Sequence, residues 1–333
     1  MKTMLLAVGG NSLIRAGEKG TIAEQLANTR RTALEIVKLI REGYRIVLTH
    51  GNGPQVGAAL LRSERAASQV PGHPLDVCDA STQGEIGYLL QQSLNNELRV
   101  AGLHLPVVTV LTQSLVSLDD PAMQHPSKPI GPFYSRVEAE ERRRMFGWAI
   151  VEDASRGYRR IVPSPQPVEI VEAEVIHDLV EMGVLVIACG GGGIPVVRKD
   201  GALLGVEAVI DKDRASALLA SRLGMDLFVI STDTEYVYLN FKKADQQPLL
   251  RVTAAELQAY SEAGHFPPGN MGPKVEAALR FLNNGGRECV ITSCENLGKA
   301  ISGSVGTHIV TNRVEPETEH EHEVEVPVGG LTI

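Results

Sequence analysis

The chain has 333 residues and a mass of 35.8 kDa, enough for one large domain or two medium-sized lobes whose core needs no disulfides. Apolar residues make up 43% and charged residues 22%, a composition that excludes wholesale disorder. The net charge of −8 lacks the basic excess typical of nucleic-acid-binding proteins. No apolar run reaches the roughly 18 residues of a membrane span, and the apolar start ends at Gly9. We therefore expect a cytoplasmic protein without nucleic-acid or membrane partners.

The acidity is concentrated in the last twenty residues, 314–333. Six glutamates alternate with other residues between positions 315 and 325, and without them the balance is 32 − 34 = −2. This composition is typical of a solvated or loosely docked extension, although His320 and His322 could also chelate a metal adventitiously. The four cysteines form no C-x-x-C pair and have no histidine at zinc spacing, so we expect reduced thiols and no protein-held metal.

Short apolar runs alternate with longer helical stretches along most of the chain. The runs have the near-continuous apolar character of strands that are covered on both faces, and glycines at 43, 102 and 224 close several helical stretches. This alternation predicts an α/β fold with an open, mostly parallel sheet between helices. The predicted strands are 4–8, 45–50, 106–111, 184–189, 226–231 and 288–293, and the predicted helices are 22–42, 54–69, 82–101, 171–182, 212–223 and 270–284.

The alternation breaks once, between about 114 and 166. Six prolines punctuate this segment, which also contains a charged helix around Arg142 and the single tryptophan, Trp148. An insertion of this size predicts a small subdomain protruding above the sheet. Such a subdomain is either a lid over a site or a plain surface excursion, and the pattern alone does not decide between them.

Glycine clusters follow three of the predicted strands. Gly9 and Gly10 precede Asn11, Gly51 and Gly53 flank Asn52, and 190–193 is a run of four glycines. In open α/β sheets ligands bind at the carboxyl ends of the strands, and glycine lets backbone N–H groups approach an anion closely. One such turn is explained by backbone geometry alone. Three at the same edge predict a phosphate or oxyanion cradle.

The common nucleotide motifs are not satisfied. The sequence has no G-x-x-x-x-G-K-[ST] segment, which excludes a P-loop. Residues 51–56 begin like a dinucleotide fingerprint, but Val56 stands where the third glycine belongs. An NAD-linked oxidoreductase is therefore the weaker alternative.

Three lysines stand in rigid contexts near these glycines. Lys212 follows a predicted N-cap, Asp211, and precedes Asp213, at the helix end that disfavours a cation unless an anion lies above it. Lys274 starts another helix, and Lys128 lies between two prolines in a predicted loop of the insertion. Singly, each could be solvated. Together they indicate phosphoryl transfer, which depends on charge neutralisation and positioning.

The segment 231–241 follows a predicted strand with polar residues before a second short apolar run. Thr232, Asp233 or Tyr236 could contact the ribose or adenine of a nucleotide, and an ordinary β-turn-β is the other interpretation.

These motifs taken together resemble the carbamate kinases of the amino-acid-kinase superfamily over most of residues 3–312. The resemblance rests on AVGGNSL, LTHGNGPQVG, TQGEIGYLLQQ, HPSKPIGPFYS, GGGGIPVV, GVEAVIDKD and GHFPPGNMGPK. The segment STDTEYVYLNF departs from the family's usual T-x-V-D-x-V, and the acidic tail lies outside the family pattern.

The resemblance implies reversible phosphoryl transfer between ATP and carbamate, giving ADP and carbamoyl phosphate, with Mg²⁺ held mainly by the nucleotide phosphates. It implies an eight-stranded sheet, a homodimer, and a usual direction toward ATP in the catabolism of arginine or purine derivatives. Residues 1–183 would form the carbamate lobe, including the protruding lid at 114–166, and residues 184–313 would form the nucleotide lobe. A protein of this fold that binds a small anion without turnover is a third alternative.

The resemblance also implies roles for the motif residues of this chain. The catalytic residues would be Lys128, Lys212, Asp213 and Lys274, with Asp213 holding the ammonium groups in place. Gly9, Gly10 and Asn11 would bind the transferring phosphoryl group, and Gly51, Asn52 and Gly53 would line the carbamate side. The nucleotide would contact Lys212, Thr232, Asp233, Tyr236, Met271, Gly272 and Lys274.

Overall fold

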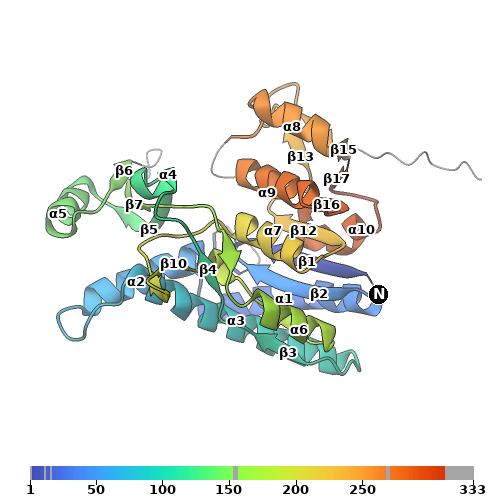
Figure 1. Cartoon of the computed structure of the whole chain (residues 1–333), viewed down its shortest axis with the longest axis horizontal. Helices are drawn as coiled ribbons and strands as arrows, with labels where there is room; N and C mark the ends of the chain where they lie inside the picture. Colours follow the sequence, from blue (N-terminus) through green and yellow to red (C-terminus); the bar gives the residue numbers. More distant parts are fainter. Residues whose placement is uncertain (1, 11–12, 16, 153–156, 268–270, 312–333) are drawn as a thin grey trace, which may run out of the picture.

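A computed structural model describes residues 2–10, 13–15, 17–152, 157–267 and 271–311. An eight-stranded sheet runs through its centre with helices on both faces (Figure 1). Neighbouring strands pair in parallel except β16 and β17, which are antiparallel. In spatial order the strands are β15 (Arg251–Thr253), β17 (Thr307–Val310), β16 (Glu288–Ser293), β12 (Leu227–Thr232), β1 (Thr3–Val8), β2 (Arg45–His50), β9 (Leu185–Ile187) and β3 (Val107–Thr109).

Alternate residues of each central strand enter two separate hydrophobic cores. In β1, Met4, Leu6 and Val8 face one core while Leu5 and Ala7 face the other, as the period of two requires. The first core is covered by α1 (Ile22–Arg41), α3 (Leu75–Val100) and α10 (Leu297–Ile301), and the second by α6 (Ala173–Glu181), α7 (Lys212–Arg222), α8 (Ala254–Glu262) and α9 (Met271–Asn283).

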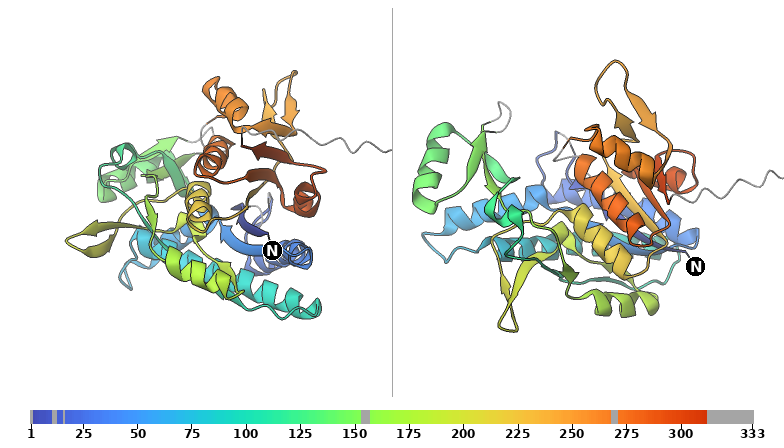
Figure 2. Two further views of the ribbon diagram at one scale, coloured as in Figure 1. Left: turned by 45° about the vertical axis from the view of Figure 1, so that its right-hand side comes forward. Right: turned by 45° about the horizontal axis from the view of Figure 1, so that its top comes forward.

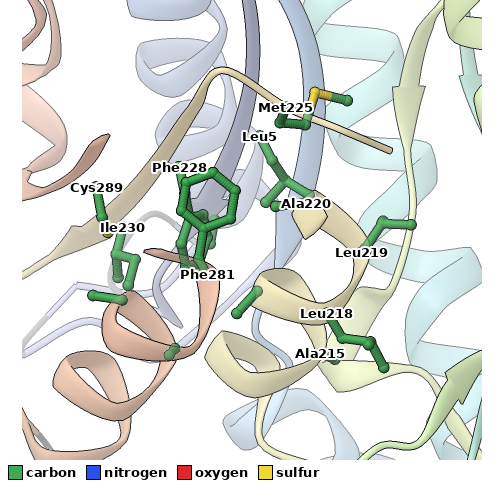
Figure 3. Packing of buried hydrophobic residues seen from close by; sticks show 14 of the residues in the cluster. Leu5, Ala215, Leu218, Leu219, Ala220, Met225, Phe228, Ile230, Phe281 and Cys289 are labelled. Atoms are coloured by element: carbon green, nitrogen blue, oxygen red, sulfur yellow. The ribbon is translucent and has the colours of Figure 1, made fainter. Parts of the chain in front are cut away.

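Helices α7 and α9 are anchored firmly on the sheet. The ring of Phe281 from α9 meets Phe228 of β12 edge-on, with centroids 5.6 Å apart, and both side chains are buried (Figure 3). Leu219 and Ala220 of α7 are fully buried beside them. Truncating a buried phenylalanine typically costs about 3–5 kcal/mol of stability. The two helices that carry Lys212 and Lys274 are therefore held rigidly relative to one another.

Smaller sheets extend the body. A four-stranded sheet and a two-stranded hairpin lie beside the main sheet, and α2 (Gly53–Ala66) follows β2 directly. The four strands are β11 (Ala202–Gly205), β10 (Ile194–Lys199), β4 (Gln113–Leu115) and β8 (Glu169–Ile170), and the hairpin is β13 (Val237–Leu239) with β14 (Gln247–Leu249).

The insertion forms a protruding three-stranded sheet with two helices. Its elements are α4 (Pro121–Gln124), β5 (Lys128–Tyr134), α5 (Arg136–Phe146), β6 (Ile150–Glu152) and β7 (Tyr158–Val162). Helix α5 is the charged helix expected there, and a reciprocal capping box between Ser135 and Glu138 fixes its start. This subdomain and the α8–α9 region project on opposite sides of α7 (Figures 1 and 2).

The α/β fold and its mostly parallel sheet are confirmed, and the glycines at 43, 102 and 224 adopt the expected left-handed conformation. Some boundaries were wrong. Helix α3 begins at Leu75 rather than at 82, because Pro74 serves as its N-cap and the buried, polar Asp79 obscured the pattern. Lys128 starts a strand rather than lying in a loop. Strands β15 and β17 and helix α8 were not predicted.

Two observations complete the description of the fold. Within the described ranges, no helix combines the length and apolarity that crossing a bilayer demands. All four cysteines are free thiols, with Cys78, Cys189 and Cys289 buried and Cys294 partly exposed. The acidic tail from 314 lies outside the described residues.

Candidate active site

The ends of β1 and β12 lie in van der Waals contact through a glycine. A Cβ on Gly9 would lie 2.9 Å from the carbonyl oxygen of Ser231, so only glycine allows the two strand ends to approach this closely. Gly10, the next residue, faces open space. Asn11, the third residue of this motif, lies outside the described residues. The described backbone leaves room beside Gly10 for a ligand.

The second glycine cluster lies against the first. A Cβ on Gly51 would be 3.5 Å from Cδ of Lys212 and 3.7 Å from the backbone nitrogen of Gly10. Asn52 is the N-cap of α2, and Gly53 is exposed at its first turn. The ends of β1 and β2 and the start of α7 therefore meet at one place, as predicted from the three glycine motifs.

The run 190–193 forms a 3-10 turn after β9 that no other residue type would fit. Gly191, Gly192 and Gly193 have φ angles of 68°, 102° and 87°. A Cβ on Gly192 would come within 2.6 Å of the carbonyl oxygen of Ile210, and one on Gly191 within 2.2 Å of Nδ2 of Asn52. This turn packs the N-terminal end of α7 against the Asn52 side chain.

Helix α7 opens with the cluster Asp211, Lys212 and Asp213. Asp211 caps the helix, as predicted, by accepting hydrogen bonds from the backbone N–H groups of Asp213 and Arg214. Asp213 is 2% exposed and accepts from two ammonium groups, Lys212 Nζ at Oδ1 and Lys274 Nζ at Oδ2, the latter at 3.3 Å. A single carboxylate therefore positions both lysines.

Lys128 reaches the same helix end from the protruding subdomain. Its Nζ donates to Oδ2 of Asp211 at 3.0 Å and to the carbonyl oxygen of Ile210 at 3.5 Å. Its side chain is 28% exposed, against 12% for Lys212 and 13% for Lys274. Three ammonium groups thus converge on the start of α7 from three different segments of the chain.

The charges of this cluster favour an anion. Burial lowers the pKa of Lys212, although Asp213 opposes that effect. Burial is the largest single influence on Lys274 and on Asp211 and works against their charged forms. The neighbouring groups together outweigh it, with Asp213 the largest contributor for Lys274 and Lys128 for Asp211, so the pKa of Lys274 is raised and that of Asp211 is depressed. Three lysines against two aspartates leave one excess positive charge, and the dipole of α7 adds to it.

A cavity of about 380 Å³ opens above these groups. Gly9, Gly10, Lys212 and Lys274 line it, as predicted for a phosphate site, together with Thr232 and Asp233, which were predicted to contact the ribose or adenine. The rest of its wall was not predicted and consists of Arg15, Asn28, Arg31, Thr32, Ser231, Cys294 and Glu295. The overlooked signal lies in α1, where the polar residues Gln25, Asn28, Thr29 and Thr32 recur at helical spacing on a buried face.

The residues expected around the nucleobase divide between two places. Met271 lines a narrow apolar pocket with Tyr238, Phe241 and Phe266, and Gly272 packs against the carbonyl oxygen of Pro267. Tyr236 lines neither this pocket nor the larger cavity. Its ring packs edge-on against Tyr238, with centroids 6.1 Å apart. The structure therefore brings Tyr238, rather than Tyr236, to the apolar pocket.

The potential for metal binding is limited in the described part of the chain, where no three His, Cys, Asp or Glu side chains cluster as metal ligands. Both carboxylate oxygens of Asp213 already accept from lysines.

Comparisons with known proteins agree with this geometry. The profile of the Amino acid kinase family matches residues 2–293. The carbamate kinase of Thermococcus kodakarensis is 50% identical over 314 residues, covering 93% of this chain and 99% of the relative. That of Staphylococcus haemolyticus is 47% identical over 312 residues, with the same coverage. The structure of the Giardia lamblia carbamate kinase bound to AMP-PNP superposes with a TM-score of 0.89 at 43% identity, covering 93% of this chain and 99% of that one.

Proposed function

This chain belongs to the amino acid kinase family, among its carbamate kinases, and is a phosphotransferase; from that premise we propose that it transfers a phosphoryl group reversibly between ATP and carbamate, giving ADP and carbamoyl phosphate. The observation that supports this most strongly is the convergence of Lys128, Lys212 and Lys274 on a glycine-built edge of the sheet. Phosphoryl transfer depends mainly on such positioned positive charge. The alternative of an NAD-linked oxidoreductase is not consistent with membership of a kinase family.

The three lysines divide the charge of the transition state between them. Lys212 and Lys274, fixed by Asp213, neutralise the phosphates of the nucleotide and the charge that develops on the transferring group. Lys128, held on the Asp211 side, serves the acceptor. The short, oriented contacts mean that these ammonium groups need little reorganisation when the reaction occurs.

The glycine motifs serve the small substrates. Gly9, Gly10 and Asn11 bind the transferring phosphoryl group, and Gly51, Asn52 and Gly53 line the carbamate side. Supporting this, Gly51 lies against the side-chain carbons of Lys212 and the backbone nitrogen of Gly10, so the two glycine motifs and this lysine meet at one place.

The nucleotide occupies the side of the cavity formed by α9 and the end of β12. Lys212, Lys274, Thr232 and Asp233 contact its phosphates and ribose, and Met271 and Gly272 lie near its base. The apolar pocket of Tyr238, Phe241 and Phe266 suits a flat adenine ring. Tyr236 remains a prediction.

Magnesium accompanies the nucleotide and is held mainly by its phosphates. The donor set of the cavity fits this role, because it presents ammonium groups to the phosphates, and the carboxylates of Asp233 and Glu295 also line it. The ion would neutralise phosphate charge alongside the lysines. A ratio of activity with and without a chelator measures this dependence.

Two lobes and a lid follow from this division of roles. Residues 1–183 form the carbamate lobe and 184–313 the nucleotide lobe, and the subdomain within 114–166 acts as a lid that brings Lys128 to the site. In support, Lys128 is the first residue of β5 in that subdomain and contacts the other lobe at Asp211.

The chain acts as a cytoplasmic homodimer that contacts through α3. The exposed face of this helix is uncharged around Gly84, Tyr88 and Asn95, and with Leu111 it lines a shallow depression. Tyr88 is 61% exposed and Leu111 is 55% exposed. An aromatic, charge-poor patch is typical of an interface core. Light scattering of the wild type and of Tyr88→Glu tests this proposal.

A coupled assay tests the reaction. With ADP, Mg²⁺ and carbamoyl phosphate, the protein should form ATP, the direction we propose for catabolism of arginine or purine derivatives. Binding of ADP without turnover would instead support an anion-binding protein of this fold. Saturable binding of NAD should not occur.

A further inference from the structure

The Asn52 side chain is held by two hydrogen bonds that fix its orientation. Its Nδ2 donates to Oδ1 of Asp79 at 2.5 Å and to Oγ1 of Thr82 at 2.8 Å. The Thr82 hydroxyl donates its only proton to the backbone carbonyl oxygen of Asp79, at 2.7 Å. It can therefore only accept a hydrogen bond from Asn52. The amide nitrogen of Asn52 must therefore face Thr82, and both of its hydrogens are used.

The carbonyl oxygen of Asn52 is consequently left to face away from this pair. Asparagine at an N-cap normally accepts a hydrogen bond from the first turn of its helix, but the Asn52 side chain makes no such bond. No residue in the described ranges donates to its Oδ1. The side chain as a whole is 3% exposed. A nearly buried carbonyl oxygen without a donor is a ready acceptor for a ligand N–H.

This amide lies close to the start of α7, where the lysines converge. It packs on Gly191, whose neighbour Gly192 touches the carbonyl oxygen of Ile210, the same atom that Lys128 approaches. The preceding residue, Gly51, packs on Lys212. Asn52 thus lies beside the start of α7, which carries Lys212 and which Lys128 approaches.

Asp79 is an unfavourable residue to bury. It is fully buried, its Oδ2 has no hydrogen-bond partner, and burial raises the pKa of its carboxyl to about 8 despite the Asn52 bond and the Lys128 charge. A leucine, which branches at the same carbon, would avoid this desolvation. What the carboxyl adds over leucine is an acceptor that holds the Asn52 amide.

We propose that Asn52 Oδ1 accepts a hydrogen bond from the amino group of the acceptor, and that Asp79 and Thr82 are positioning residues that hold the amide in this orientation. This inference rests on the proposed function. In this proposal, Asn52 discriminates carbamate from carboxylates of the same size that carry no N–H, because only carbamate can donate a hydrogen bond to the Asn52 carbonyl oxygen.

The test uses ADP as the phosphoryl acceptor and compares two donors, carbamoyl phosphate and acetyl phosphate. Carbamoyl phosphate carries an amino group where acetyl phosphate carries a methyl group. We expect Asn52→Ala and Asp79→Leu to lower kcat/KM for carbamoyl phosphate about tenfold, the scale of one hydrogen bond, and to change acetyl phosphate less than about threefold. Asp79→Asn keeps an acceptor oxygen and should retain the preference. If acetyl phosphate turnover is too slow to measure, the inhibition constant of acetyl phosphate against carbamoyl phosphate can be used instead to measure the preference between the two compounds.

A matched control separates recognition from stability. Ser93→Ala, also in α3, removes a buried hydrogen bond to Thr29 at 2.9 Å, distant from the acceptor residues, and should leave both reactions unchanged. Equal losses for both donors in Asn52→Ala and Asp79→Leu would show a merely structural role and overturn the inference, as would an unchanged preference. A wild type that forms no ATP from carbamoyl phosphate would overturn the proposed function and this inference with it.

Discussion

Replacing Lys128 by methionine removes one ammonium group from the start of α7 while keeping an unbranched side chain of similar length. The lost contacts are the 3.0 Å bond to Asp211 and the 3.5 Å bond to the Ile210 carbonyl. Asp211 keeps its capping bonds to α7, and the ion pair is partly exposed, so we expect a loss of stability of only about 1 kcal/mol. Removing one preorganised charge-stabilising donor should lower kcat by about 10² to 10³.

Steady-state kinetics and ADP titration on the same preparation check this expectation. The affinity for ADP should hardly change, because we propose that Lys212 and Lys274, and not Lys128, contact the nucleotide. Arg136→Met is a suitable control, since this exposed arginine of the same subdomain pairs only with Glu140 within its own helix among the described contacts. If Lys128→Met keeps turnover within about threefold of the wild type, far from the expected loss, its role at the acceptor side is wrong.

Further variants test other parts of the account. Asp213→Asn leaves Lys212 and Lys274 without their shared carboxylate and should destabilise the unliganded chain by about 3 kcal/mol, with inorganic phosphate restoring part of the melting temperature; equal melting temperatures would contradict this. Deleting 314–333 should leave kcat nearly unchanged, and a tenfold loss in a folded truncation would show that the tail reaches the site. Burial lowers the pKa of His50 from 6.5 to about 4. Between these two pH values the unfolded chain binds a proton at His50 and the folded chain does not. The free energy of unfolding should therefore fall by up to about 3 kcal/mol as the pH drops from 6.5 to about 4. Denaturation of His50→Gln should show a flatter pH dependence there. Isothermal titration should detect Mg-ADP and not NAD.

The central strands and the lysine positions could be predicted from the sequence because each carries a local signal. Strand β1 is a continuous apolar run ending in glycines, and Lys212 occupies a helix start that disfavours cations. Short strands such as β15, with three residues, have no apolar run long enough to be recognised as a strand in the sequence. They form because β17 is already in place beside them.

The missed site residues are missed for a different reason. Arg31 and Asn28 belong to α1, which the sequence presents as an ordinary amphipathic helix, and only the tertiary fold turns its polar stripe toward the cavity. Asp79 behaves similarly, because it lies in α3 while its partner Asn52 is the N-cap of α2, and no local pattern reveals that these two elements approach one another. Tyr238 lies within β13 and reaches the apolar pocket, whereas Tyr236 lies just before that strand and does not.

The central claim is that the lysine cluster at the start of α7 transfers a phosphoryl group between carbamoyl phosphate and ADP. Phosphorus NMR of that mixture with Mg²⁺, run in parallel for the wild type and Lys212→Met, tests it most directly. We predict that ATP resonances grow with the wild type as carbamoyl phosphate disappears, and that they grow at least about a hundredfold more slowly with the variant. Equal ATP formation by both proteins, or release of inorganic phosphate alone by the wild type, would contradict the claim.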